Sequence, residues 1–220
     1  MVKLLLGLSM LLATLNRVHL TSYYPGLLAG GCGGTIITKR HVLTAAHCLL
    51  RNNVYVQKVV VTYGSVDRRR GKKVDASKML IHKDYHMTKH VNDIALLEVK
   101  YPFQFSKEVT PICLPMVPAP LVNKDAVVAG WGSLYYGGQG VDFLRHTTVS
   151  IYPDVICSFI FWRLDYAGAR QCCANNIGKG ACKVFQDVPL GLLDNQQVSC
   201  IESSSRSIRS SHGVGCFVPS

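Results

Sequence analysis

Acidic residues are scarce in this 220-residue chain, in which 13 Asp and Glu stand against 24 Lys and Arg, a net charge of +11. Such an excess attracts acidic surfaces, although an ordinary basic secreted protein fits it equally well. The chain also lacks a basic helix and any ladder of alternating basic and aromatic residues, the patterns by which nucleic-acid-binding proteins are recognised. We therefore predict that it has no nucleic-acid partner.

The chain also lacks an apolar run long enough to span a bilayer comfortably. The run at residues 4–15 follows Lys3 and falls short of the length of a transmembrane helix. A positive start followed by a short apolar run is typical of a secretory signal peptide, although no small-x-small pair defines the cleavage site. The sequence predicts a signal peptide at residues 1–17, a secreted, extracellular protein and no stable membrane insertion; a membrane anchor is the alternative.

Cysteines, in contrast, are frequent, with nine in the chain. Together with a signal peptide, this number indicates an oxidising compartment and a framework of disulfide bonds. Because nine is odd, at least one cysteine is left over or bonds to another chain.

The stretch from Cys32 to Cys48 carries the most informative pattern. Gly33 and Gly34 open a β-branched run of the kind that strands favour, and a second apolar run and two alanines then lead to His47. A disulfide between Cys32 and Cys48 would pin the turn that presents His47. The stretch resembles the block that carries the catalytic histidine of trypsin-like (chymotrypsin-family) serine proteases, where this histidine is the general base.

A second block begins at Asp93, 46 residues after His47, and reads Asp-Ile-Ala-Leu-Leu. It resembles the family's block whose aspartate orients the catalytic histidine. Residues 111–115 and 129–132 resemble the family's interdomain connection and the opening of its second barrel. The resemblance therefore implies that His47 and Asp93 are two members of a catalytic triad.

The many short runs separated by Gly and Pro turns favour an all-β barrel or sandwich. The resemblance narrows this to an all-β, chymotrypsin-like double six-stranded β-barrel. We expect a trypsin-like domain at residues 18–198, with residues 24–28 as its first strand and two halves joined near residues 105–122. A Ser-rich tail at residues 199–220 replaces the family's last elements, so the second barrel is predicted to be incomplete at its C-terminus.

The family's nucleophile motif is altered in this chain. The family has Cys-x-Gly-Asp-Ser-Gly-Gly-Pro-Leu, and the corresponding residues 182–190 read Cys-Lys-Val-Phe-Gln-Asp-Val-Pro-Leu. Gln186 stands at the nucleophile position, and an amide is not a nucleophile. Val184 replaces the glycine of the oxyanion hole, and Phe185 replaces the aspartate that receives the activated amino terminus. The resemblance thus implies a catalytically degenerate homologue that keeps only remnants of the triad.

The resemblance also implies a set of disulfide bonds. The expected pairs are Cys32–Cys48, Cys157–Cys173 and Cys182–Cys216, with Cys200 as the alternative to Cys216. Cys113, Cys172 and Cys200 are left to pair otherwise or to stay free.

We predict no metal and no cofactor. His82, His86 and His90 lie four residues apart, which suits metal ligands only on a helix, whereas the resemblance implies a strand followed by a loop. The run Arg-Arg-Arg-Gly-Lys-Lys at residues 68–73 occupies the loop that carries acidic ligands in calcium-binding relatives. This run is either a solvated loop or a site for a polyanion.

Three interpretations of function follow. The first is a secreted, non-catalytic serine protease homologue that acts by binding other secreted proteins, namely a protease, an inhibitor or a substrate of a proteolytic pathway. The second is a truncated product without function. The third is a residual serine endopeptidase, as family membership alone suggests. The resemblance to a serine endopeptidase family leaves enzyme activity uncertain. We predict that the protein is inactive because Gln186 stands at the nucleophile position.

Overall fold

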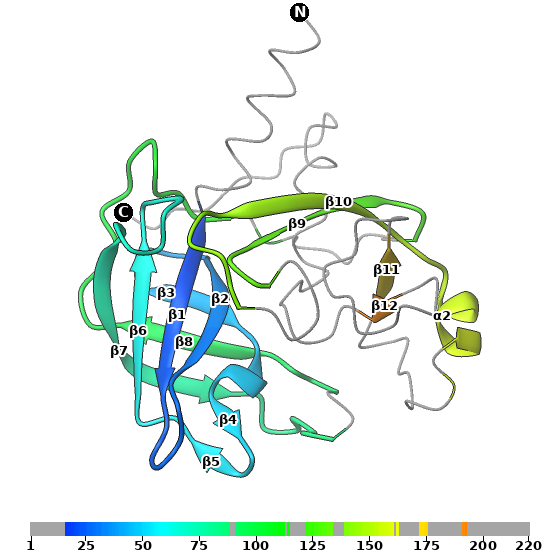
Figure 1. The fold of residues 1–220 in the computed structure, drawn as a ribbon, viewed down its shortest axis with the longest axis horizontal. Helices are drawn as coiled ribbons and strands as arrows, with labels where there is room; N and C mark the ends of the chain where they lie inside the picture. The colour runs from blue at the N-terminus through cyan, green and yellow to red at the C-terminus, as the bar shows by residue number, and fades with distance from the viewer. Residues whose placement is uncertain are drawn as a thin grey trace, which may run out of the picture.

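The computed structural model describes residues 16–88, 91–112, 114, 122–133, 139–160, 162, 172–175 and 191–192. Its first half is a closed barrel with the strand order β1-β2-β3-β8-β7-β6, beside a small β4-β5 hairpin. The second half, as far as described, is a four-stranded sheet in the order β12-β11-β10-β9 (Figure 1). No helix in the described part of the chain has the length and hydropathy needed to cross a bilayer.

The barrel strands are β1 (Arg17–Tyr23), β2 (Gly30–Ile36), β3 (His41–Thr44), β6 (Lys58–Tyr63), β7 (Lys72–Ile81) and β8 (Ala95–Val99). The hairpin strands are β4 (Leu50–Arg51) and β5 (Val54–Tyr55), and the short 3-10 helix η1 (Ala46–Cys48) follows β3. The second half contains β9 (Asp125–Gly130), β10 (Arg145–Ile151), α2 (Asp154–Ile160), β11 (Cys173–Asn175) and β12 (Gly191–Leu192).

Alternating apolar residues fill the first barrel. Val18 and Leu20 of β1, Val59 and Val61 of β6, and Leu97 of β8 are all fully buried. Within β1 and within β6, one residue separates the two buried residues, as expected for strands with one face toward a core. The barrel closes because β1 pairs antiparallel with both β2 and β6. The predicted all-β class and the first six-stranded barrel are confirmed; the incompleteness of the second barrel stays a prediction.

Gly34 lets β1, β2 and β3 pack closely. A Cβ atom there would lie 2.7 Å from the Cγ1 atom of Val42 and 3.1 Å from the Cγ2 atom of Val18. Real Cβ atoms do not approach other atoms this closely, so only glycine fits without moving the neighbouring strands. The glycine thus lets the strand that carries Cys32 lie directly against β3, which leads to His47.

The predicted first strand was wrong. Residues 24–28 form a turn, and the first strand is β1, which ends at Tyr23. Tyr24 instead turns inward, where its side chain is 7% exposed and its hydroxyl donates to the Cys48 carbonyl oxygen at 2.7 Å. Gly26 adopts a φ of +67°, the left-handed conformation that reverses the chain here.

β1 begins at the residue where the predicted signal peptide ends. Arg17 pairs with Thr35 at the beginning of β1 and is 8% exposed, and the Asn16 carbonyl oxygen accepts from the Ile36 N–H at 2.8 Å. Cleavage after residue 17 would remove the first residue of a barrel strand. The domain boundaries at residues 17 and 198 stay predictions.

Backbone hydrogen bonds tie the loop after β6 to the segment that leads into β10. The Leu144 N–H donates to the Val66 carbonyl oxygen at 2.8 Å, and the Arg68 N–H donates to the Asp142 carbonyl oxygen at 3.0 Å. The indole Nε1–H of Trp131 donates to the same Val66 carbonyl oxygen at 2.9 Å. We call this contact between the two halves the inter-barrel brace; it consists of residues 66–69 with Trp131 and residues 142–144.

Charged side chains strengthen the inter-barrel brace. Arg69 donates two hydrogen bonds of 2.9 Å to the buried Asp67 carboxylate and lies 3.0 Å from Asp142. Arg68 donates from Nε to Asp142 at 3.2 Å. The hydrogen bond from Arg69 is the main reason that the pKa of Asp67 falls to about 2. The first two arginines of the 68–73 run are therefore ion-paired and are not free to bind a polyanion.

His19 contributes a pH-sensitive contact to the same region. Its ring meets the Trp131 ring edge-on, with centroids 5.9 Å apart and planes at 87°. Burial, and next the nearby Arg68 guanidinium, lower the pKa of His19 from 6.5 to about 4. Between these two values the unfolded chain binds a proton at this site and the folded protein does not.

We therefore expect His19 to make the protein less stable as the pH falls from about 6.5 to about 4. The loss should be on the order of 2 kcal/mol, allowing for partial exposure of the ring to solvent. Urea unfolding of the wild type and His19→Gln at pH 7.0 and 4.5 measures it, and the variant should show the smaller difference between the two pH values. His146→Gln, on the exposed end of β10, is the control and should behave as the wild type. Equal pH dependence in the wild type and His19→Gln would contradict this assignment.

Candidate active site

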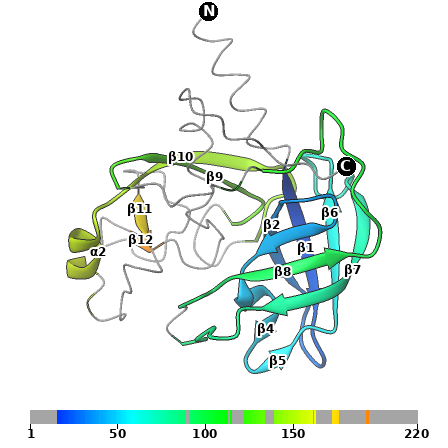
Figure 2. The same ribbon diagram turned by 180° about the vertical axis from the view of Figure 1, so that it is seen from behind.

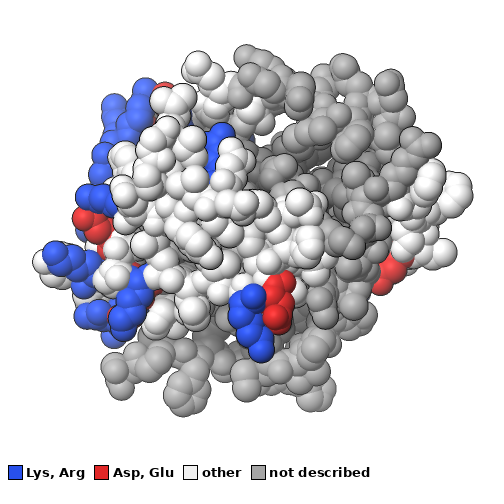
Figure 3. All heavy atoms as spheres, turned by 90° about the horizontal axis from the view of Figure 1, so that it is seen from below, with Lys and Arg blue, Asp and Glu red and all other residues white. Residues whose placement is uncertain are grey.

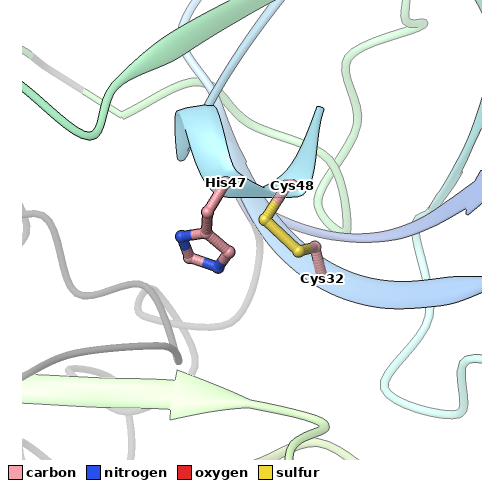
Figure 4. Close-up of side chains that lie close together, drawn as sticks. All are labelled: Cys32, His47 and Cys48. Atoms are coloured by element: carbon pink, nitrogen blue, oxygen red, sulfur yellow. A yellow bond between two sulfur atoms is a disulfide. The ribbon is translucent and has the colours of Figure 1, made fainter. Parts of the chain in front are cut away.

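His47 is presented by the short helix η1, which a disulfide attaches to β2. Cys48 in η1 is bonded to Cys32 in β2, as predicted, and Ala46 between β3 and Cys48 is fully buried. The Thr44 hydroxyl donates to the Gly33 carbonyl oxygen at 2.9 Å and holds the end of β3 against β2. Small residues and a covalent bond thus fix the backbone from which the imidazole projects (Figure 4).

The Sγ atoms of Cys32 and Cys48 and a ring nitrogen of His47 all lie within 4.8 Å of one another. Both sulfur atoms are in the disulfide bond, so neither is a thiolate that could bind a metal ion. The group therefore positions the histidine and does not form a metal site.

Asp93 reaches His47 because β8 pairs with β3. Thr44 at the end of β3 lies opposite Ala95 at the start of β8, so the residues just beyond each strand end meet. Asn92 adopts a φ of +58°, and its side-chain amide donates to the Asp84 carbonyl oxygen at 2.8 Å. This left-handed residue turns the chain so that Asp93 faces η1.

The Asp93 carboxylate accepts two hydrogen bonds from His47. The backbone N–H of His47 donates to Oδ1 at 2.9 Å, and the ring Nδ1 lies 2.7 Å from Oδ2. The side chains of His47 and Asp93 are 20% and 17% exposed. An ionised carboxylate only accepts hydrogen bonds, so Nδ1 carries the proton and the lone pair of Nε2 is left as a base. This is the orientation that acyl-transfer triads require of their histidine.

The structure brings together His47 and Asp93 from the predicted site residues. Gln186 and the rest of residues 182–190 lie outside the described residues. His82 and His86 lie on the turns after β7, where the His86 N–H donates to the Val91 carbonyl oxygen, so this segment is not the helix that a metal site of their spacing needs. His90 lies outside the described residues.

Sequence reasoning missed two groups that hold the pair in place. The first is the backbone N–H of His47, which a motif of side chains does not reveal. The second is Asn92, whose position directly before Asp93 is the available signal, since Asn is enriched in the left-handed conformation.

Two of the predicted disulfides are present among the described residues, Cys32–Cys48 and Cys157–Cys173. Cys172, which was expected to pair otherwise or stay free, is also disulfide-bonded. Cys182, Cys200 and Cys216 lie outside the described residues, and so does Cys113.

A comparison with protein families agrees with this geometry, because the Trypsin family model matches residues 18–183. The chain belongs to the trypsin family. Chymotrypsin-2 of Vespa crabro is 34% identical over 160 residues, which cover 72% of this chain and 71% of that protein. A venom serine protease of Polistes dominula is 32% identical over 161 residues, which cover 69% of this chain and 57% of that protein.

Other trypsin-family relatives are much longer than this chain. Serine protease filzig of Drosophila melanogaster is 35% identical over 133 residues, which cover 59% of this chain and 8% of that protein. The chain thus spans between 8% and 71% of these three relatives. A solved structure titled "Structure of GrC" has the same fold, with a TM-score of 0.68, 24% identity, and coverage of 82% of this chain and 78% of that one.

Replacing Asp93 with asparagine should reverse the tautomer of His47. The asparagine carbonyl oxygen can still accept from the His47 backbone N–H, but its amide then faces Nδ1 as a donor, which forces the ring proton to Nε2. Nitrogen-15 NMR of the histidine ring distinguishes the two tautomers at neutral pH. Asp84→Asn is the control. Asn92 donates to the backbone carbonyl of Asp84 and not to its side chain, so this change should leave the ring signals unchanged. An unchanged tautomer in Asp93→Asn would contradict the hydrogen bond between Nδ1 and Oδ2.

Proposed function

We propose that this trypsin-family protein is a secreted, non-catalytic homologue that acts by binding other proteins. The observation that carries the proposal is Gln186 at the position of the nucleophilic serine. Cys182, Pro189 and Leu190 anchor that alignment without a gap, and the match to the family model ends at residue 183, just before the altered stretch. Without a hydroxyl there is no atom for the His47 base to activate.

Further replacements support loss of activity and not a change of nucleophile. Val184 stands at the glycine of the oxyanion hole, where a β-branched residue resists unusual backbone angles. Phe185 cannot form the ion pair that orders this loop in active relatives. The losses affect three separate parts of the mechanism: the nucleophile, the stabilisation of the oxyanion and the ordering of the loop.

A structural role gives a reason for keeping His47 and Asp93. Asp93 is mostly buried and would need new partners for its carboxylate if His47 were lost. Its two hydrogen bonds join η1 to the residues before β8 and so tie the disulfide-bonded turn to the barrel. The pair can therefore persist without catalysis.

Secretion and the type of partner belong to the same proposal. Two disulfides within the described residues suit an oxidising compartment. The relatives include proteins named venom serine proteases. The partner we propose is a protease, an inhibitor or a substrate of a proteolytic pathway, bound through the protease-like surface.

We expect no hydrolysis of peptides or esters by the wild type, and no rescue by Gln186→Ser. The serine restores a hydroxyl only, and a missing oxyanion donor alone typically lowers turnover by about 10²–10³. Both proteins are assayed with a broad peptide library and with a phosphonate that labels active-site serines, with His47→Ala as the control. Cleavage by the wild type that disappears in His47→Ala favours the residual endopeptidase, and strong activity in Gln186→Ser would show that the oxyanion hole is intact.

We also expect the secreted full-length protein to capture a defined partner. A pull-down with protein identification should recover a small, reproducible set of secreted proteins. His47→Ala removes an imidazole that is only 20% exposed, and it should capture the same set if it folds. Recovery of chaperones alone would favour the truncated, non-functional product instead.

A further inference from the structure

One outer face of the first barrel carries many more cations than carboxylates. Its strands are β3, β8, β7 and β6, which are neighbours in the barrel. Figure 3 shows Lys and Arg side chains gathered on the side where Figure 1 places β6 and β7, with few acidic side chains among them. We call this surface, together with the adjoining turns and strand ends at one end of the barrel, the basic face. Its cations are Lys39, Arg40, Lys58, Lys72, Lys73, Lys78 and Lys100, and its carboxylates are Asp75 and Glu98. Its two central strands, β8 and β7, lie side by side in Figure 2.

The strand register brings these side chains together. Glu98 of β8 lies opposite His41 of β3 on one side and Lys78 of β7 on the other. The Lys100 N–H donates to the Asp75 carbonyl oxygen at 2.9 Å. Because adjacent strands are about 4.8 Å apart, and residues two apart on one strand share a face, Lys73 lies beside Asp75 in the same surface.

The two carboxylates are too few to neutralise this surface. Glu98 is shared by Lys78 at 3.2 Å and Arg40 at 3.6 Å, and Asp75 is paired with Lys58 at 3.1 Å. The hydrogen bond from Lys78, above all, lowers the pKa of Glu98. Glu98 therefore stays ionised, and the two carboxylates still leave an excess of positive charge on this face.

Four of the cations are exposed and have no carboxylate partner among the described residues; they are Lys39, Lys72, Lys73 and Lys100. Arg68 and Arg69, in contrast, are paired with carboxylates in the inter-barrel brace. These four ammonium groups thus have no ion pair to break before they meet an anion from solution; that of Lys100 lies 5.5 Å from the centre of the Tyr101 ring.

The basic face lies away from the candidate active site. Arg40 and His41 are at the start of β3, whereas His47 follows its end; likewise Glu98 is near the end of β8, whereas Asp93 precedes its start. A ligand on the basic face can therefore bind while the surface around His47 stays open. The basic face is thus available whether or not the protein is catalytic.

We propose that the basic face binds a sulfated polysaccharide. A linear polyanion with regularly spaced sulfates can contact several of these lysines at once, because Lys39 before β3, Lys100 after β8, and Lys72 and Lys73 at the start of β7 all lie at the same end of these strands. Lysine is a compact point charge that suits sulfate without requiring the bidentate geometry of arginine. Among the described residues, the large exposed aromatics known to lie next to cations of this face are Tyr101 and Tyr23, which is opposite Lys58; they do not form the row of stacking rings that single-stranded nucleic acids use.

The disulfides favour this polyanion over those found inside cells. Cys32–Cys48 attaches η1 directly to β2 of the same barrel, so the barrel is suited to an oxidising environment. Sulfated polysaccharides are the abundant polyanions of such extracellular environments. Binding should be mainly electrostatic, and it should weaken steeply as salt is added.

The test compares two full-length variants with the same loss of net charge. The face variant carries Lys39→Gln, Lys72→Gln, Lys73→Gln and Lys100→Gln. The control variant carries Lys83→Gln, Lys107→Gln, Lys124→Gln and Arg145→Gln, which remove four exposed cations elsewhere on the described surface. All eight side chains are exposed, and thermal unfolding checks that both variants keep the wild-type stability.

Affinity for a heparin oligosaccharide is measured by calorimetry from 50 to 300 mM NaCl. We expect the wild type to bind at 150 mM NaCl, the face variant to bind at least tenfold more weakly, and the control variant to change less than threefold. The slope of log affinity against log salt should fall by roughly one for each contacting lysine removed.

Other ligands distinguish the alternatives. Chemically desulfated heparin should bind at least tenfold more weakly than heparin. The proposal is overturned if the wild type does not bind heparin at 150 mM NaCl, if the two variants weaken equally, or if desulfation has no effect. It is also overturned if phosphatidylserine vesicles or duplex DNA bind more tightly than heparin and depend on the same four lysines.

Discussion

The antiparallel pairing of β3 with β8 is the interaction on which the rest of the first half depends. It completes the closed barrel, and its register puts Thr44 opposite Ala95 at one end and His41 opposite Glu98 at the other. The first end brings Asp93 to His47, and the second forms the centre of the basic face. A shift by one residue would turn the buried Val42 and Leu97 toward solvent and separate Asp93 from η1 at the same time. Core packing therefore fixes both surfaces.

The hydrogen bonds of Asp93 explain how a catalytic geometry can outlast catalysis. In an active triad, the carboxylate orients the histidine for a serine that lies in the other barrel. In this chain the carboxylate also accepts from the His47 backbone, and that contact stabilises the turn whether or not a nucleophile is present. The His–Asp pair depends on β3, η1 and β8, all in the first barrel. Changes at residues 182–190 leave those elements untouched.

Local sequence blocks predicted much of the site, and contacts between distant segments account for what they missed. The blocks around His47 and Asp93 led us to expect neighbouring side chains, because each block carries its own turn and strand. The first strand was misplaced because β1 begins only two residues after the apolar run at residues 4–15, and its alternation of Val18 and Leu20 is too short to stand out beside that run. The Arg68–Asp142 contact joins residues 74 positions apart, and no composition or spacing reveals such a pair.

The basic run at residues 68–73 shows that a run of charges predicts a binding surface only in part. Arg68 and Arg69 stand in the densest run, yet Asp67 and Asp142 neutralise them and use them to join the two halves. Lys72 and Lys73 end the same run but belong to the basic face, where the barrel places them beside lysines from distant segments. What decides their availability is the supply of carboxylates: two carboxylates pair with three of the seven cations on this face and leave four without a partner among the described residues. The positive charge that is available for binding therefore depends on where the fold places the carboxylates, and not on which segment is the most basic.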